Sequence, residues 1–158
     1  MDEAFTAATG DGPVQQGPGP GRASEGRAAE VRVALAGLLQ IRRLTNADAP
    51  DPEAVPAAWE HGRIAQAVAL GLEGSGIAPS AVDAEGRRVA TGYRVRTGEP
   101  GSVVVEWLGP RGSGAGGQEE DALTVCRGVL EGLGWDALLY RGRGRHRFLE
   151  VRPPHRGG

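Results

Sequence analysis

The chain has 158 residues, of which 39% are hydrophobic and 24% are charged, and its formal net charge is −2. These values predict one small soluble domain with flexible segments, and no apolar run approaches the roughly 18–20 residues that a membrane span needs. The single cysteine, Cys126, excludes an intrachain disulfide, and an acidic start in place of a basic one argues against a secretory signal. We therefore expect a cytoplasmic protein.

The basic residues are all arginine, and lysine is absent from the chain. Together with abundant alanine and glycine, this composition indicates a bacterial genome rich in GC. The absence of lysine excludes a P-loop nucleotide site and a Schiff-base lysine.

The N-terminal part of the chain divides into a tail and a first helix. Residues 1–23 contain three Gly-Pro steps and almost no large apolar side chain, so we expect a disordered tail. A helix is predicted over residues 24–44, because four apolar residues recur at helical spacing: Val31, Leu35, Leu38 and Leu39. A second apolar stripe on this helix contains Val33, Ile41 and Leu44. Such a helix either lies sandwiched in a core or contacts another chain.

The next elements are a second helix and a hairpin. We predict a helix over residues 56–73, with Pro56 in its first turn and Gly74 at its end. The apolar period then changes from 3.6 to 2, which predicts a β-hairpin over residues 87–108. Three arginines alternate onto its solvent-facing side: Arg88, Arg94 and Arg96.

The C-terminal part repeats the order of helix and hairpin. A glycine-rich loop is expected at residues 109–117, followed by a helix over 119–133 and a second hairpin over 135–151. Residues 152–158 are expected to form a flexible tail. The predicted fold class is therefore α+β: two helices and then a ββαββ unit, whose mostly antiparallel four-stranded sheet is covered by helix. A single domain would span residues 24–151.

The turn of the second hairpin carries the clearest functional signal. Residues 141–147 contain two glycines, one histidine, no acidic residue and four arginines: Arg141, Arg143, Arg145 and Arg147. Guanidinium groups bind phosphate through paired N–H donors, and glycine allows close approach of the backbone. We expect a non-enzymatic binding protein that contacts a polyanion, nucleic acid in particular, through these four residues. Arg88, Arg94 and Arg96 would be secondary contacts.

Two alternatives to nucleic-acid binding remain open at this point. One is a protein-interaction module, in which the first helix forms a homodimer through Val31, Leu35, Leu38 and Leu39. The arginine-rich turn would in that case be merely solvated, or would meet an acidic protein partner.

The other alternative is a nucleotide-binding enzyme. Gly112 to Gly117 match the pattern G-x-G-x-x-G, and Asp136 follows at the distance of a ribose-binding acid. The acidic residues after this loop would repel a pyrophosphate. The chain shows no spacing typical of metal ligands and no catalytic constellation, so we expect no cofactor and no catalytic residue.

Overall fold

The structure is a computed structural model that describes residues 6–13 and 22–154. Three helices lie along the first half of the chain: α1 (Arg22–Thr45), α2 (Ala58–His61) and α3 (Ile64–Gly74). The short 3-10 helix η1 (Pro52–Ala54) lies between α1 and α2. Within the described part of the chain, no helix has the length and apolar character that crossing a membrane requires.

The second half of the chain alternates strands with one long helix. A two-stranded sheet contains β1 (Ala81–Val82) and β2 (Arg88–Ala90). The main sheet has the order β3-β4-β6-β5, and every neighbouring pair is antiparallel. Its strands are β3 (Gly92–Thr97), β4 (Val103–Leu108), β5 (Asp136–Arg141) and β6 (Arg147–Arg152), with α4 (Ala115–Gly132) between β4 and β5. The predicted α+β class is confirmed.

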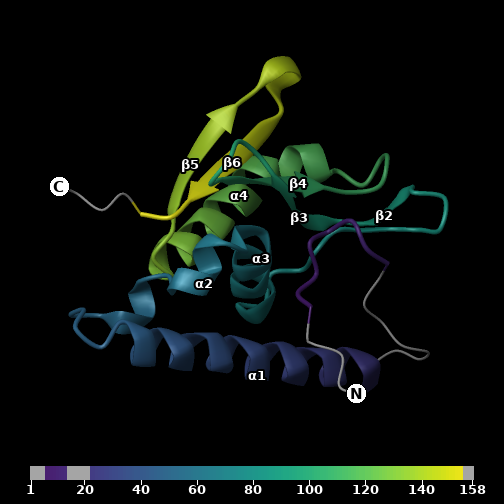
Figure 1. Cartoon of the computed structure of the whole chain (residues 1–158). Helices are drawn as coiled ribbons and strands as arrows, with labels where there is room; N and C mark the ends of the chain where they lie inside the picture. Colours follow the sequence, from purple (N-terminus) through teal and green to yellow (C-terminus); the bar gives the residue numbers. More distant parts are fainter. Residues whose placement is uncertain (1–5, 14–21, 155–158) are drawn as a thin grey trace.

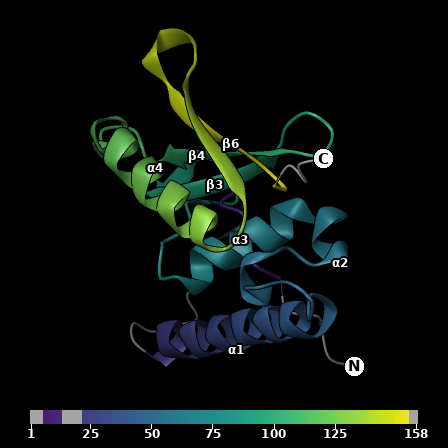
Figure 2. The same ribbon diagram turned by 90° about the vertical axis from the view of Figure 1, so that its left-hand side faces the viewer.

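The core lies between the main sheet and the helices. Alternate residues of the strands face inward, as do three residues of α4 that are inaccessible to solvent: Leu123, Cys126 and Leu130. Helix α3 is apolar on almost every side, because it lies between α1 and the sheet (Figures 1 and 2). Helix α1 is thus an outer layer that packs on α3 with one face only.

The predicted second helix, 56–73, is wrong as one continuous element. Residues 52–74 instead form η1, α2 and α3, and the break between α2 and α3 lies at Gly62 and Arg63, where Arg63 has non-helical torsions. The side chain of Glu60, in α2, turns inward and accepts a hydrogen bond from the backbone N–H of Ala57 at 2.7 Å. The same carboxylate forms a buried ion pair with Arg42 of α1, so α2 is tied to α1 as well as to its own N-terminus.

The predicted first hairpin is also interrupted. The first strand of the hairpin predicted over residues 87–108 divides at Thr91, and β2 pairs with β1 rather than with β4. Gly92 lies directly against the chain at Ala78, where a Cβ atom would stand 2.2 Å from the Ala78 carbonyl oxygen. Only glycine permits so close an approach of the two backbones, which form a parallel bridge between Pro79 and Tyr93.

The remaining predicted elements agree closely with the structure. Helix α4 begins at Ala115, four residues before the predicted start, so the glycine-rich loop is shorter than expected. Gly134 follows α4 with a φ of +88°, the left-handed conformation that favours glycine after a helix. The second hairpin, β5 and β6, forms as predicted, and residues 155–158 of the predicted C-terminal tail lie outside the described residues.

Residues 6–13, which we expected to be disordered, have a fixed place against the main body. The carbonyl oxygen of Thr9 accepts a hydrogen bond from Val95 of β3 at 2.6 Å, and that of Gly12 accepts one from Val82 at 2.9 Å. The hydroxyl of Tyr93 donates to the Ala8 carbonyl oxygen at 2.7 Å. Backbone hydrogen bonds position this segment, which explains why its low hydrophobicity was misleading.

Candidate polyanion interface

The candidate interface is the turn of the β5–β6 hairpin, which projects beyond the rest of the sheet (Figures 1 and 2). The two strands pair from Asp136↔Arg152 to Arg141↔Arg147. The turn is closed by a hydrogen bond from the Gly142 N–H to the His146 carbonyl oxygen at 2.6 Å, and Gly144 has a φ of +72°. Glycine is therefore required here by backbone conformation, quite apart from any ligand.

The four arginines of this turn have different surroundings. The side chains of Arg141 and Arg143 are exposed, and no carboxylate in the described part of the chain lies within ion-pair distance of either. Arg147 is more buried, and its Nη2 lies 3.4 Å from a carboxylate oxygen of Glu120. The side chain of Arg145 lies outside the described residues.

A hollow of about 590 Å³ lies between the turn and the first turns of α4. Its lining includes Arg141, Arg147 and the backbone of Gly116. Glu119 also lines it, but one carboxylate oxygen accepts the Arg147 backbone N–H at 2.6 Å and the other lies 3.0 Å from His146 Nδ1. The acidic group of the hollow is thus already bonded to the turn.

The three arginines predicted as secondary contacts are bound to carboxylates of the chain itself. Arg88 and Arg94 lie 2.8 Å from different oxygens of Asp11. Arg94 and Arg96 both approach Glu106, at 3.2 Å and 3.0 Å. Burial by itself would raise the pKa of Asp11, but hydrogen bonds from Arg88 and Arg94 outweigh it and lower that pKa. These arginines form an internal charge network, separate from the exposed side chains of the turn.

His146 joins this network to the hairpin, a role that the sequence analysis missed. Its Nε2 lies 3.0 Å from Glu106 of β4, and its Nδ1 lies 3.0 Å from Glu119 of α4. Only the protonated imidazolium can donate from both nitrogens, so both contacts are hydrogen bonds in that form. The histidine thereby braces the base of the turn against a strand and a helix. In the described residues, no group of His, Cys, Asp and Glu side chains could hold a metal ion.

The pKa of Glu106 is lowered in this environment. Burial acts to raise it, but hydrogen bonds from His146 and Arg96 and the charges of Arg96 and Arg94 have the larger combined effect. Glu106 is therefore held as a carboxylate among three basic groups on the face of the sheet opposite the helices.

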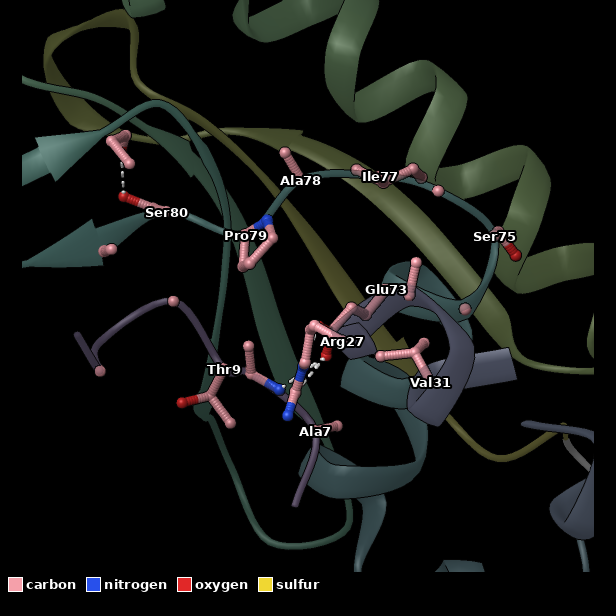
Figure 3. Close-up of a pocket in the computed structure, with 18 of the residues that line it drawn as sticks. Ala7, Thr9, Arg27, Val31, Glu73, Ser75, Ile77, Ala78, Pro79 and Ser80 are labelled. Atoms are coloured by element: carbon pink, nitrogen blue, oxygen red, sulfur yellow. Dashed lines mark hydrogen bonds and ion pairs between the residues drawn. The ribbon is translucent and has the colours of Figure 1, made fainter. Parts of the chain in front are cut away.

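A groove of about 890 Å³ lies at the other end of the molecule, between residues 6–13, the start of α1 and the loop after α3 (Figure 3). Arg27 and Glu73 meet in it, with Nε and Oε2 2.8 Å apart. The hydrogen bond to Glu73 raises the pKa of Arg27. Because these charges already satisfy each other, the groove offers mainly apolar contacts from residues such as Val31 and Ile77.

The predicted dimerisation residues lie largely inside the fold. Val31 and Leu38 are buried, and Leu35 and Leu39 are partly buried against the core. The stripe of α1 that faces solvent is instead Val33, Ile41 and Leu44, of which Val33 is 73% exposed. The first helix thus uses its predicted interaction face to pack on α3.

The glycine-rich loop lies outside any parallel βαβ unit. Helix α4 follows it, but β4 and β5 belong to an entirely antiparallel sheet and are separated there by β6. A dinucleotide site needs the parallel strands of a doubly wound sheet, so the resemblance of Gly112–Gly117 to that motif does not extend to the surrounding structure.

Comparison of the chain with protein-family models, curated proteins and solved structures gave no match.

Proposed function

We propose that this protein is a non-enzymatic binding protein that contacts a polyanion, specifically nucleic acid, through the turn of its β5–β6 hairpin. The observation that carries the proposal is the exposure of Arg141 and Arg143 on a projecting turn, with no partner carboxylate among the described residues. A guanidinium to which no carboxylate of the described residues is bound retains its capacity to bind phosphate. A cytoplasmic location, where nucleic acid is present, fits this function.

Two further features of the turn support a nucleic-acid ligand. Gly144 is exposed, and a Cβ atom there would meet no atom within 4 Å, so a phosphate backbone has room to approach the main chain at this position. Tyr140 and Phe148 stack at the base of the turn with ring centroids 5.7 Å apart, and Tyr140 is 42% exposed. An exposed aromatic ring beside arginines can stack on an unpaired base, which favours single-stranded over duplex ligands.

The internal charge network limits the size of the proposed interface. Arg88, Arg94 and Arg96 would have to leave Asp11 or Glu106 before they could bind phosphate. We therefore assign them a smaller contribution than Arg141 and Arg143. An interface with few phosphate contacts predicts weak binding that is readily reversed by salt.

Heparin chromatography of the double variant Arg141→Ala/Arg143→Ala tests the proposal. The wild-type chain should be retained at low salt and elute later than this variant. A second double variant, Arg63→Ala/Arg87→Ala, is the matched control, because it removes the same charge from exposed positions elsewhere. If the two double variants elute together, net charge alone governs retention and the proposed interface is wrong.

A further inference from the structure

The two edge strands of the main sheet, β3 and β5, differ in whether other segments of the chain form hydrogen bonds with them. At the β3 edge, the N–H of Tyr93 donates to Ala78 at 3.0 Å, and the carbonyl oxygen of Tyr93 accepts from Ser80 at 2.8 Å. The N–H of Val95 donates to Thr9 at 2.6 Å. Segments from elsewhere in the chain therefore cover this edge, which prevents it from pairing with another strand.

The opposite edge, β5, has no such cover. Opposite residues of an antiparallel pair alternate between pairs that are joined by backbone hydrogen bonds and pairs that are not. The hydrogen bond from the Gly142 N–H to the His146 carbonyl oxygen makes these two residues a bonded pair, so every second pair along the hairpin from this point is also bonded. The backbone groups of Asp136, Leu138 and Tyr140 therefore face β6. Those of Ala137, Leu139 and Arg141 face outward, and no group in the described part of the chain forms a hydrogen bond with them.

Apolar side chains accompany this open edge. Leu138 and Tyr140 are 48% and 42% exposed and lie on the sheet face away from α4, because Ala137 and Leu139 between them face the core. An uncovered edge strand with exposed apolar side chains is a surface on which a further strand can pair.

We propose that a second copy of this chain pairs with this edge, β5 against β5 and antiparallel, about a two-fold axis at Leu139. In this register the backbone N–H and C=O groups of Ala137 form hydrogen bonds with those of Arg141 of the partner subunit. The backbone groups of Leu139 form hydrogen bonds with those of Leu139 of the partner subunit. All three outward-facing residues of each strand are then hydrogen-bonded. Leu138 lies opposite Tyr140 of the partner subunit, in the non-bonded position where side chains approach most closely.

The self-complementarity of β5 favours a second copy over an unrelated strand. A two-fold axis turns each exposed leucine toward an exposed tyrosine, so both apolar groups become covered in the same contact. Six residues on each side make an interface much smaller than the roughly 20–30 residues a side of a standard specific complex, so the association is expected to be weak. We expect a reversible dimer with a Kd between about 1 µM and 1 mM, which corresponds to roughly −8 to −4 kcal/mol.

Cysteine cross-linking in the absence of nucleic acid tests the dimer and its register. Non-bonded antiparallel partners have Cα atoms about 4.5 Å apart, within the range of a disulfide. An equimolar mixture of Leu138→Cys and Tyr140→Cys chains, oxidised by air and copper phenanthroline, should give a covalent dimer in high yield. The native Cys126 is fully buried and does not compete.

Two controls make the result decisive. A Val125→Cys chain places a thiol at a 59% exposed position on α4, and its yield gives the background from random collision. Leu138→Cys chains alone should not exceed that background, because the proposed register keeps the two copies of residue 138 apart. A mixture that cross-links no better than Val125→Cys, or preferential self-linking of Leu138→Cys chains, would overturn the proposal.

The cross-linking result can be separated from the proposed nucleic-acid interface, although Tyr140 belongs to both surfaces and its ring would be open to a base only in the monomer. Cross-linking reports on the backbone edge and on Leu138 and Tyr140, and it requires no ligand. If the chains do not cross-link but the heparin experiment gives the expected result, only the proposed dimer is wrong. If the chains cross-link but the two arginine double variants elute together from heparin, only the proposed polyanion interface is wrong.

Discussion

Arg42 and Glu60 form a completely buried ion pair that connects four elements. Arg42 Nε and Nη2 donate to the two carboxylate oxygens of Glu60 at 2.9 and 2.7 Å, and Arg42 Nη1 donates to the carbonyl oxygens of Glu53 and Leu133. Each donor group of this arginine therefore has a specific partner. This pair joins α1 to η1, to α2 and to the end of α4.

Replacing Glu60 with glutamine should destabilise the fold strongly. The change leaves the Arg42 charge buried with no counterion, a loss that costs about 3–5 kcal/mol. Glu53→Gln is the matched control, because its ion pair with Arg43 is largely exposed and should contribute at most about 1 kcal/mol. Urea denaturation measures both effects, and equal losses in the two variants would show that burial of the Arg42 pair is unimportant.

The lowered pKa of Glu106 predicts loss of stability in acid. Its ordinary pKa is 4.5, and the folded state binds its proton less readily than the unfolded state. The resulting stabilisation is fully present above pH 4.5 and disappears as the pH falls through the lower folded-state value. Glu106→Gln should therefore show a smaller decrease in its urea midpoint than wild type over this interval. A Glu99→Gln control should behave as wild type, and an unchanged pH dependence in Glu106→Gln would contradict the assignment.

The contacts of individual charged side chains are the part of the structure that the sequence predicted least well. A basic residue is common in the last turn of a helix because the helix dipole favours it there, so the position of Arg42 gives no sign that its side chain is buried. The alternation along residues 88–96 gave no sign that Asp11 would reach Arg88 and Arg94 from a distant segment. Partners so far apart in the sequence are brought together only by the completed fold.

At the scale of elements, local periodicity predicted α1, α4 and the β5–β6 hairpin, because each buries one regular stripe of apolar residues. Periodicity failed to predict the structure where contacts between residues far apart in the sequence determine the path of the backbone. The helix predicted over 56–73 is divided because Glu60 turns toward Arg42, and residues 6–13 are held by backbone hydrogen bonds to β3. Neither effect leaves a periodic signal.

The contact between residues 6–13 and β3 depends on Gly10. Its φ is +100°, and a Cβ atom there would lie 2.4 Å from the Tyr93 carbonyl oxygen. Gly10→Ala should displace the segment and expose the Val95 N–H, so the exchange of that amide with deuterium should accelerate. Gly12→Ala is the matched control, since its Cβ would meet no atom within 4 Å. Equal exchange of Val95 in both variants would mean that Gly10 does not hold the segment in place.

Across the whole molecule, charge is unevenly distributed along the chain. Residues 1–83 contain 6 arginines and 11 acidic residues, whereas residues 84–158 contain 12 arginines and 9 acidic residues. The hairpin turn and α1 lie at opposite ends of the structure (Figures 1 and 2). If the proposed interface binds a polyanion, this separation would orient the ligand toward the turn, because the negatively charged part of the chain would repel it.

The salt dependence of binding to a fluorescent single-stranded oligonucleotide tests the central claim most directly. If Arg141 and Arg143 each contact one phosphate, their replacement by alanine should reduce the slope of log K against log salt by about 1.4, or roughly 0.7 per contact. The Arg63→Ala/Arg87→Ala control should retain the wild-type slope. Equal slopes for wild type and Arg141→Ala/Arg143→Ala would contradict the account.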